Sequence, residues 1–180
     1  MCFAIVAFMQ EIFTIGHSTR PINEFIEILN SISIAHLIDI RHFPGSRRYP
    51  HFNKDSLAES LAKANIKYTH IVELGGRRKP EKNSVNTAWR VEAFKGYADH
   101  MATDEFKKGM KLLMDIASKE TAAYMCSEAV WWSCHRALVS DYLKWKGWLV
   151  RHIMAKGKTE EHPYTKAAKI IEGKLSYQAD

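Results

Sequence analysis

Residues 126–136 place several reactive side chains close together in the sequence. Cys126 is followed two positions later by Glu128, and Cys134, His135 and Arg136 are consecutive. Cysteine acts as a nucleophile or metal ligand in its thiolate form, which a nearby imidazole, guanidinium or helix N-terminus favours. A carboxylate near a histidine can orient the imidazole or transfer protons itself. We therefore predict catalytic roles for Cys126, Glu128, Cys134 and His135.

More than one role stays open for the two thiols. A free cysteine is commonly a small buried hydrophobic residue, and a Cys126–Cys134 disulfide or redox pair is a further alternative. The segment does not match the loop of cysteine phosphatases or rhodaneses, because Trp132 stands where the arginine that closes such an anion site would be. The chain also lacks a C-x-x-C motif, a glycine-rich phosphate loop and a dinucleotide fingerprint.

Metal binding is a separate alternative for the same segment. Its two thiols, imidazole and carboxylate are all ligand types, and His17 or His42 could complete a site. The spacing of these residues matches no structural zinc pattern. We therefore assign no metal ligand from the sequence and name no cofactor.

Strand-like and helix-like segments alternate along the chain. Apolar runs predict strands within residues 11–19, 35–40, 66–74, 121–127 and 148–154. Amphipathic patterns predict helices over residues 21–29, 53–65, 88–101, 104–117, 134–147 and 163–173, with a turn at 157–162. This order predicts an α/β fold: a single domain over residues 9–180, with a mainly parallel sheet of about five strands and helices on both faces. Residues 1–8 are expected to be an N-terminal extension.

The loops after the first four predicted strands carry most of the arginines. In parallel α/β sheets, ligands bind beyond the carboxyl ends of the strands, and seven of the nine arginines fall in these loops. Arginine binds phosphate or carboxylate through a two-pronged contact, so this concentration predicts an anion site. The alternative is a basic rim paired with acidic side chains. The residues expected to bind substrate are His17, Ser18, Arg20, Arg41, Arg47, Arg48, Glu73, Arg77, Trp131 and Arg136.

Two acidic residues and a tryptophan pair in these loops have alternative roles. Asp39 and Glu73 both fall at predicted strand ends, where they could form an acid–base pair or neutralise neighbouring arginines. We include Asp39 among the candidate catalytic residues. Of the adjacent Trp131 and Trp132, one is expected to face the pocket or stack on a base while the other packs into the core.

Composition and charge narrow the class of protein. The net charge is +6. Residues 41–80 hold 9 basic and 3 acidic side chains, so the excess of positive charge in this stretch equals the net charge of the whole chain. This asymmetry favours an anionic partner, either a small molecule or nucleic acid. Three cysteines are too few for a disulfide scaffold, and no apolar run approaches the roughly 20 residues that span a bilayer. We therefore expect a cytoplasmic protein without a membrane partner, and the sequence indicates no oligomeric state.

Several motifs resemble the DUF488 family of uncharacterised proteins. They are TIGHSTRPINEFIEIL, LIDIRHFPGSRRYPHFN, YTHIVELGGRR, FKGYADHM, MCSEAVWWSCHR and HPYTKAAKIIEGKLSY, in this order from about Met9 onward. The resemblance implies no established reaction. It does imply that the signature positions are Gly16, His17, Ser18, Asp39, Arg41, Pro44, Gly45, Glu73, Gly75, Cys126, Glu128, Cys134, His135 and Arg136.

The sequence leads to one main hypothesis and two alternatives. The main hypothesis is an enzyme that acts on a phosphate-containing, nucleotide or nucleic-acid substrate through an arginine-rich pocket with Cys, Glu and His. The first alternative is a noncatalytic nucleic-acid-binding module. The second is a metal or redox site at Cys126 and Cys134. All three require the strand-end loops to meet at one place.

Overall fold

The computed structural model describes residues 9–179, so the expected extension over residues 1–8 lies outside the described residues. One sheet of six strands forms its centre, in the order β3-β2-β4-β1-β5-β6. The first five strands in sequence are parallel, and β6 is antiparallel to β5. The bounds are β1 Glu11–Gly16, β2 His36–Asp39, β3 Lys67–His70, β4 Ala122–Cys126, β5 Leu149–Ala155 and β6 Lys158–Glu161.

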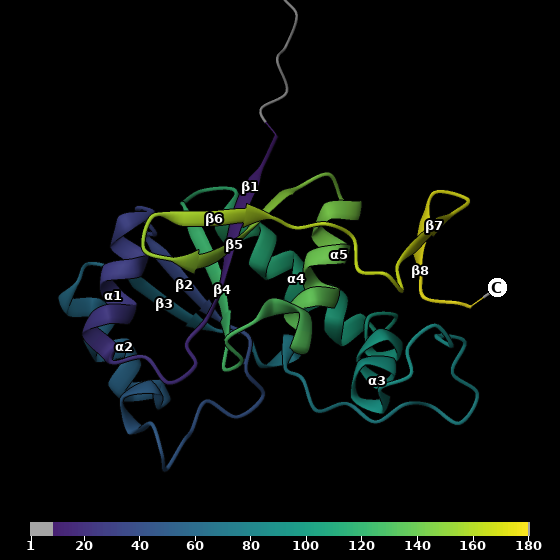
Figure 1. Cartoon of the computed structure of the whole chain (residues 1–180), viewed down its shortest axis with the longest axis horizontal. Coiled ribbons are helices and arrows are strands. Elements are labelled where there is room, and N and C mark those ends of the chain that lie inside the picture. Colours follow the sequence, from purple (N-terminus) through teal and green to yellow (C-terminus); the bar gives the residue numbers. More distant parts are fainter. Residues whose placement is uncertain (1–8, 180) are drawn as a thin grey trace, which may run out of the picture.

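Helices cover both faces of this sheet (Figure 1), which confirms the predicted fold class. One face is covered by α1 (Ile22–Ser31) and α2 (Lys54–Lys63). The other is covered by α3 (Glu92–His100), α4 (Asp104–Ala117) and α5 (Arg136–Trp145). Strand side chains alternate between two hydrophobic clusters, because successive residues of a strand point to opposite faces. Ile12 packs with the α4 and α5 side, whereas Phe13 packs with the α1 and α2 side.

The prediction of a helix over residues 163–173 is wrong. This segment contains β7 (Lys169–Ile171), which pairs with β8 (Lys174–Ser176) in a small antiparallel sheet. The connecting Glu172 and Gly173 have φ angles of 49° and 75°. Positive φ at both central residues is the type I′ turn that matches the twist of a hairpin. The Glu-Gly turn therefore determines the local structure.

Other predicted boundaries also need correction. The predicted turn at residues 157–162 contains β6, which pairs with β5 around Gly157 at a φ of 66°. The third strand ends at His70, and Glu73 lies in a short 3-10 turn, Val72–Leu74. Among the described residues, no helix is both long and apolar enough to cross a membrane.

Candidate active site

A pocket of about 700 Å³ opens at the carboxyl edge of the parallel strands. Strand register explains why distant residues meet here. Gly16 at the end of β1 pairs with Cys126 at the end of β4, and Asp39 at the end of β2 pairs with Met125. The loops that leave these strands therefore start from one line across the sheet. The predicted site residues that line the pocket are His17, Ser18, Arg41, Arg48, Arg77, Cys126, Glu128, Cys134 and His135.

Two thiols and one imidazole form the most compact group in the pocket. The Nδ1 atom of His135 lies 3.8 Å from Cys126 Sγ and 3.6 Å from Cys134 Sγ. The opposite ring nitrogen, Nε2, donates a hydrogen bond to the carbonyl of Ile40 at 3.0 Å. This bond holds a proton on Nε2 and directs Nδ1 at the two sulfurs. Both cysteines are free thiols and are buried.

The two thiols differ in acidity despite equal burial. The pKa of Cys126 is held well below its ordinary value, first by a hydrogen bond from Cys134 and then by His135 and Arg136. Burial, together with the neighbouring Cys126, raises the pKa of Cys134 well above its ordinary value. Cys126 therefore carries the negative charge of the pair, and Cys134 donates its proton to it.

Arg136 is buried beneath the loop that follows β4 and is absent from the pocket wall. Its side chain is 1% exposed. It donates hydrogen bonds to Thr14 Oγ1 at 3.2 Å and to the Glu128 carbonyl at 2.6 Å. Within the described residues it has no carboxylate partner. It therefore anchors the loop that carries Glu128, and its uncompensated charge favours an anion at the nearby thiols.

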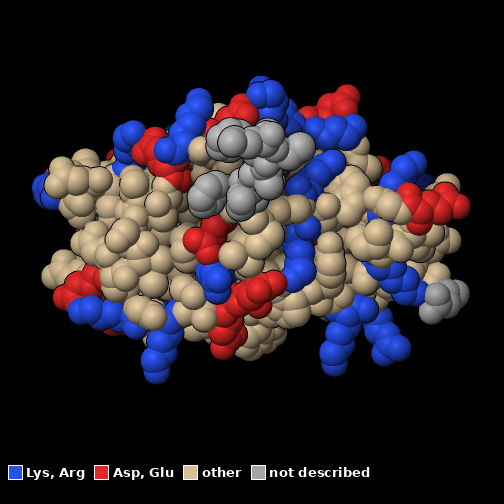
Figure 2. Space-filling view, turned by 90° about the horizontal axis from the view of Figure 1, so that it is seen from above, with Lys and Arg blue, Asp and Glu red and all other residues tan. Residues whose placement is uncertain are grey.

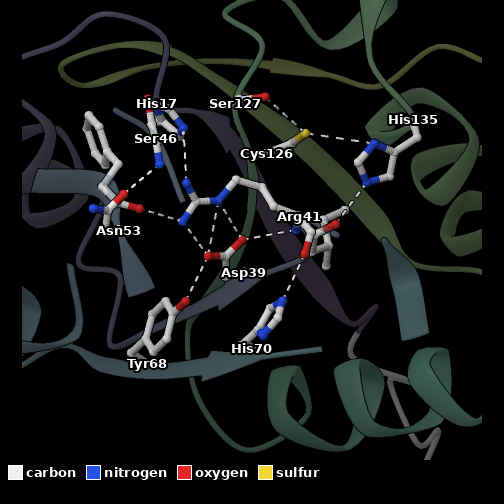
Figure 3. Close-up of polar contacts among 12 residues, drawn as sticks. His17, Asp39, Arg41, Ser46, Asn53, Tyr68, His70, Cys126, Ser127 and His135 are labelled. Atoms are coloured by element: carbon white, nitrogen blue, oxygen red, sulfur yellow. Dashed lines mark hydrogen bonds and ion pairs between the residues drawn. The ribbon is translucent and has the colours of Figure 1, made fainter. Parts of the chain in front are cut away.

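Arg41 is also buried, but a carboxylate neutralises it. Its guanidinium donates to Asp39 through Nη2 at 2.6 Å and through Nε at 2.9 Å (Figure 3). Tyr68 donates its hydroxyl to the same carboxylate at 2.8 Å. Arg41 Nη2 also donates to the carbonyl of Phe52 at 2.8 Å. Asp39 therefore fixes Arg41 in place, which matches the charge-neutralising alternative for this residue.

His17 lines the pocket beside this ion pair. Its Nδ1 donates to the Ser18 carbonyl at 2.9 Å, so Nε2 can accept from Arg41 Nη1 at 3.3 Å. Burial, reinforced by the charge of Arg41, lowers the pKa of His17 to about 4. His17 also stacks on Phe52, with 4.1 Å between ring centroids. It is therefore a neutral imidazole at ordinary pH.

Two glycines allow the third loop to approach the histidines. A Cβ atom on Gly76 would lie 2.9 Å from His135 Nδ1, and one on Gly75 would lie 2.7 Å from the His42 Cα. These distances are shorter than real Cβ contacts. The two glycines therefore let backbone pack against two imidazoles.

Two arginines of the pocket wall are not neutralised by a carboxylate among the described residues. Arg48 and Arg77 have no carboxylate partner among the described residues. Each lies over an aromatic ring: Arg48 is 5.5 Å from the centroid of Tyr49, and Arg77 is 5.7 Å from that of Phe43. Glu128 is the one acidic residue of the described pocket lining. The wall therefore has a net positive charge that suits an anionic ligand.

The structure places the remaining predicted residues elsewhere. Arg20 donates to the Gly16 carbonyl at 2.6 Å, and Glu73 lies 3.6 Å from Lys108 rather than beside Asp39. Arg47 is exposed outside the described lining. Trp131 stacks on His152 with 4.5 Å between centroids, away from the pocket. Glu73 and Asp39 therefore do not form an acid–base pair.

Sequence reasoning missed three residues that shape the site. Tyr97 of α3 lines the pocket and packs on His135 with 4.9 Å between ring centroids. Its position in an amphipathic helix had indicated only a core role. Phe43 lines the mouth, and Tyr68 holds Asp39 from the side of β3. Nothing in their local spacing indicated contact with the thiol segment.

The amino-terminal edge of the sheet, at the opposite end of the molecule, has mixed charge. Figure 2 views this edge and shows basic and acidic side chains interspersed. Lys67 pairs with Glu120 at 2.8 Å, and Arg151 pairs with Glu11 at 2.6 Å. Such surface pairs add little stability, but they remove the uniform positive field that a nucleic-acid interface requires.

The fold and the pocket define the class of protein: an α/β protein with a thiol–imidazole group and free arginines at the carboxyl edge of a parallel sheet. A family model, the domain of unknown function DUF488, matches residues 21–143. The match covers most of the chain, so the protein belongs to the DUF488 family. No curated protein matches the chain, and no solved structure does.

Proposed function

We propose that the protein is an enzyme that binds a phosphate-containing anion in the carboxyl-edge pocket. The observation that supports this most directly is the pairing of free arginines with a reactive group in one cavity. Arg48 and Arg77 lie on the wall that also contains the Cys126, Cys134 and His135 group. Buried Arg41 shapes the wall but is already neutralised by Asp39. The anion would therefore contact the two outer arginines.

The chemistry in this proposal belongs to the thiol–imidazole group and to Glu128. Glu128 lines the pocket and is exposed, and its carboxylate has no partner among the described residues. It is therefore free to transfer a proton to or from a bound substrate. Ser127 and Ser18 offer hydroxyl groups beside it. Two free thiols in close contact also fit a reducing compartment, and we propose a cytoplasmic location on this basis.

The test is turnover of a panel of phosphate esters, nucleotides and short single-stranded oligonucleotides. Cys126→Ser and Glu128→Gln should each abolish turnover while the far-ultraviolet circular dichroism spectrum stays unchanged. Arg77→Gln should raise KM, and Arg90→Gln, an exposed arginine outside the described lining, should not. Full turnover by the Cys126→Ser, Glu128→Gln double variant would refute the proposed chemistry.

Binding without turnover would favour the noncatalytic alternative. A nucleic-acid-binding module releases counterions, so its affinity falls steeply with salt, by a slope of about 0.7 to 0.9 for each phosphate contact. A small anion held by two arginines shows a much weaker dependence. An oligonucleotide affinity with a steep slope that decreases in Arg77→Gln, in the absence of turnover, would replace the enzyme proposal.

A further inference from the structure

We infer that Cys126, Cys134 and His135 form a Zn²⁺ site whose fourth position opens into the pocket. The inference rests on the proposed function for its chemical consequence, because it names how the site would activate its reactant. The metal site itself rests on geometry alone. Its three ligand atoms all lie within 4.8 Å of one another, in a pocket that is otherwise rich in positive charge.

The two sulfur–nitrogen distances are those of a tetrahedral zinc site. Zinc binds cysteine sulfur at about 2.3 Å and histidine nitrogen at about 2.0 to 2.1 Å, so a tetrahedral S–Zn–N angle separates sulfur from nitrogen by about 3.5 to 3.6 Å. The observed separations from His135 Nδ1 are 3.6 Å to Cys134 Sγ and 3.8 Å to Cys126 Sγ. A zinc ion therefore fits between these atoms with little movement of the protein.

The surroundings of the three residues fix the ligands in the orientation that a metal requires. Metal-binding histidines almost always donate their other ring nitrogen to a carbonyl or carboxylate. His135 does so to the Ile40 carbonyl at 3.0 Å, which leaves Nδ1 as the free lone pair. The backbone amide of Arg136 lies 3.5 Å from Cys134 Sγ and can donate to it. Tyr97 also packs against the imidazole, with 4.9 Å between ring centroids.

Charge also favours a metal held by two thiolates. A Zn²⁺ ion and two thiolates together are neutral. The buried Arg136 guanidinium lies beside this group without a carboxylate partner among the described residues. Any anion that completes the zinc shell would therefore be compensated by Arg136 and by the free arginines of the wall. The sequence indicated a metal site here only as an alternative, because its spacing matches no zinc pattern: Cys126 ends a strand, and Cys134 precedes a helix across an irregular loop.

An open fourth position would make this a water-activating site. Three protein ligands plus one water is the arrangement of catalytic zinc, which brings the pKa of bound water to about 7. The water would pass a proton to the Glu128 carboxylate, and the hydroxide would bond to the electrophilic phosphorus or carbon of the substrate. The bond to the leaving group would break with its electron pair, and Glu128 would return the proton to that group. The net reaction is hydrolysis.

The test measures metal binding to the full chain under reducing conditions, without substrate. Metal-free protein is titrated with Zn²⁺ against a chromophoric chelator and, separately, with Co²⁺. We expect one ion per chain and a Co²⁺ spectrum with thiolate-to-metal charge transfer and intense tetrahedral bands. Cys134→Ser and His135→Gln should weaken Zn²⁺ binding beyond the roughly 10- to 100-fold that loss of a supporting hydrogen bond costs. The matched control, Cys2→Ser, should bind as the original chain does.

A second measurement needs no variant and guards against misfolding. Zn²⁺ should protect two of the three cysteines of the original chain from alkylation. Peptide mapping should identify these two as Cys126 and Cys134. Unprotected thiols at saturating Zn²⁺, an octahedral Co²⁺ spectrum, or undiminished binding in Cys134→Ser would each overturn the inference.

The outcomes also separate this inference from the proposed function. Failure of the chain to bind Zn²⁺ at Cys126, Cys134 and His135, together with turnover that depends on Cys126, would refute the zinc site and leave the enzyme proposal standing. Specific Zn²⁺ binding by these three residues, with no turnover or anion binding in the pocket, would refute the proposed function and leave the zinc site standing.

Discussion

A buried histidine outside the pocket should make the protein lose stability in mild acid. His152 on β5 lies 2.9 Å from His162 Nδ1, and His162 Nε2 donates to Asp141 at 3.0 Å. Trp131 stacks on the His152 ring, and Arg136 contributes a nearby positive charge. Burial, then His162 and Arg136, lower the pKa of His152 to about 2. The folded protein therefore cannot protonate His152 at pH 5, whereas the unfolded chain can.

The magnitude follows from the difference between the two pKa values. With an unfolded value of about 6.5, the unfolded chain gains about 2 kcal/mol from proton binding between pH 7 and pH 5, and the folded state gains almost nothing. Stability is present above pH 6.5 and is lost as the pH falls below it. If the free energy of unfolding falls by about 2 kcal/mol for each molar of urea, this loss lowers the urea midpoint of unfolding by about 1 M.

Urea unfolding followed by tryptophan fluorescence, at pH 7 and at pH 5, provides the assay. In His152→Gln the loss between the two pH values should be about 2 kcal/mol smaller than in the original chain. Each protein is compared with itself at the two pH values. Any effect of the substitution on the free energy of unfolding at neutral pH therefore cancels. The same exchange at the half-exposed His51 provides a control. An identical pH dependence in His152→Gln would show that His152 is protonated normally in the folded state.

Three further substitutions, one of them with a matched control, test other contacts. Asp141→Ala removes the acceptor shared by His162, Thr165 and Tyr177 and should lower the free energy of unfolding by about 3 to 5 kcal/mol. The exposed Asp115→Ala should change this energy by less than about 0.5 kcal/mol, and equal effects would refute the role of burial. Gly76→Ala should displace His135 and reduce both metal affinity and turnover with little change in melting temperature; unchanged affinity would contradict the close contact. Tyr68→Phe should cost about 1 to 3 kcal/mol in urea unfolding, because Asp39 loses a buried donor, and no loss would mean that water replaces it.

The fold could be predicted from the sequence because its signals are local. Apolar runs such as the one before Cys126 and amphipathic stripes such as the one in α4 define elements by their own periodicity. The loops that follow parallel strands all lie at the same edge of the sheet. This rule placed Cys126, Arg41 and Arg77 in one region. The failures arose where a short segment supported two structures. Residues 163–173 have the apolar content of a helix, but the Glu172-Gly173 turn stabilises a hairpin.

The candidate site could be predicted in location but not in detail, because contacts across the sheet have no sequence signal. His135 reaches the carbonyl of Ile40, which lies 95 positions earlier, and this bond determines which nitrogen faces the thiols. Arg136 stands beside His135 in sequence, yet α5 points it under the loop rather than into the pocket. Trp131 likewise turns away to cover His152. Residue type indicated reactivity, whereas helix phase determined which residues reach the cavity.

The two buried arginines explain why the chemistry concentrates at the thiols. Both are removed from water, which is costly for a charge without a partner. Arg41 has Asp39 at 2.6 Å, so its charge is balanced where it stands. The Arg136 side chain donates only to neutral oxygens among the described residues, and its charge lowers the pKa of both Cys126 and Cys134. The fold thus stabilises negative charge at one end of the pocket floor and leaves the other end neutral. An anionic substrate held by Arg48 and Arg77 would therefore face the thiolates, or a metal bound by the thiolates. It would not face a further unpaired guanidinium in the pocket.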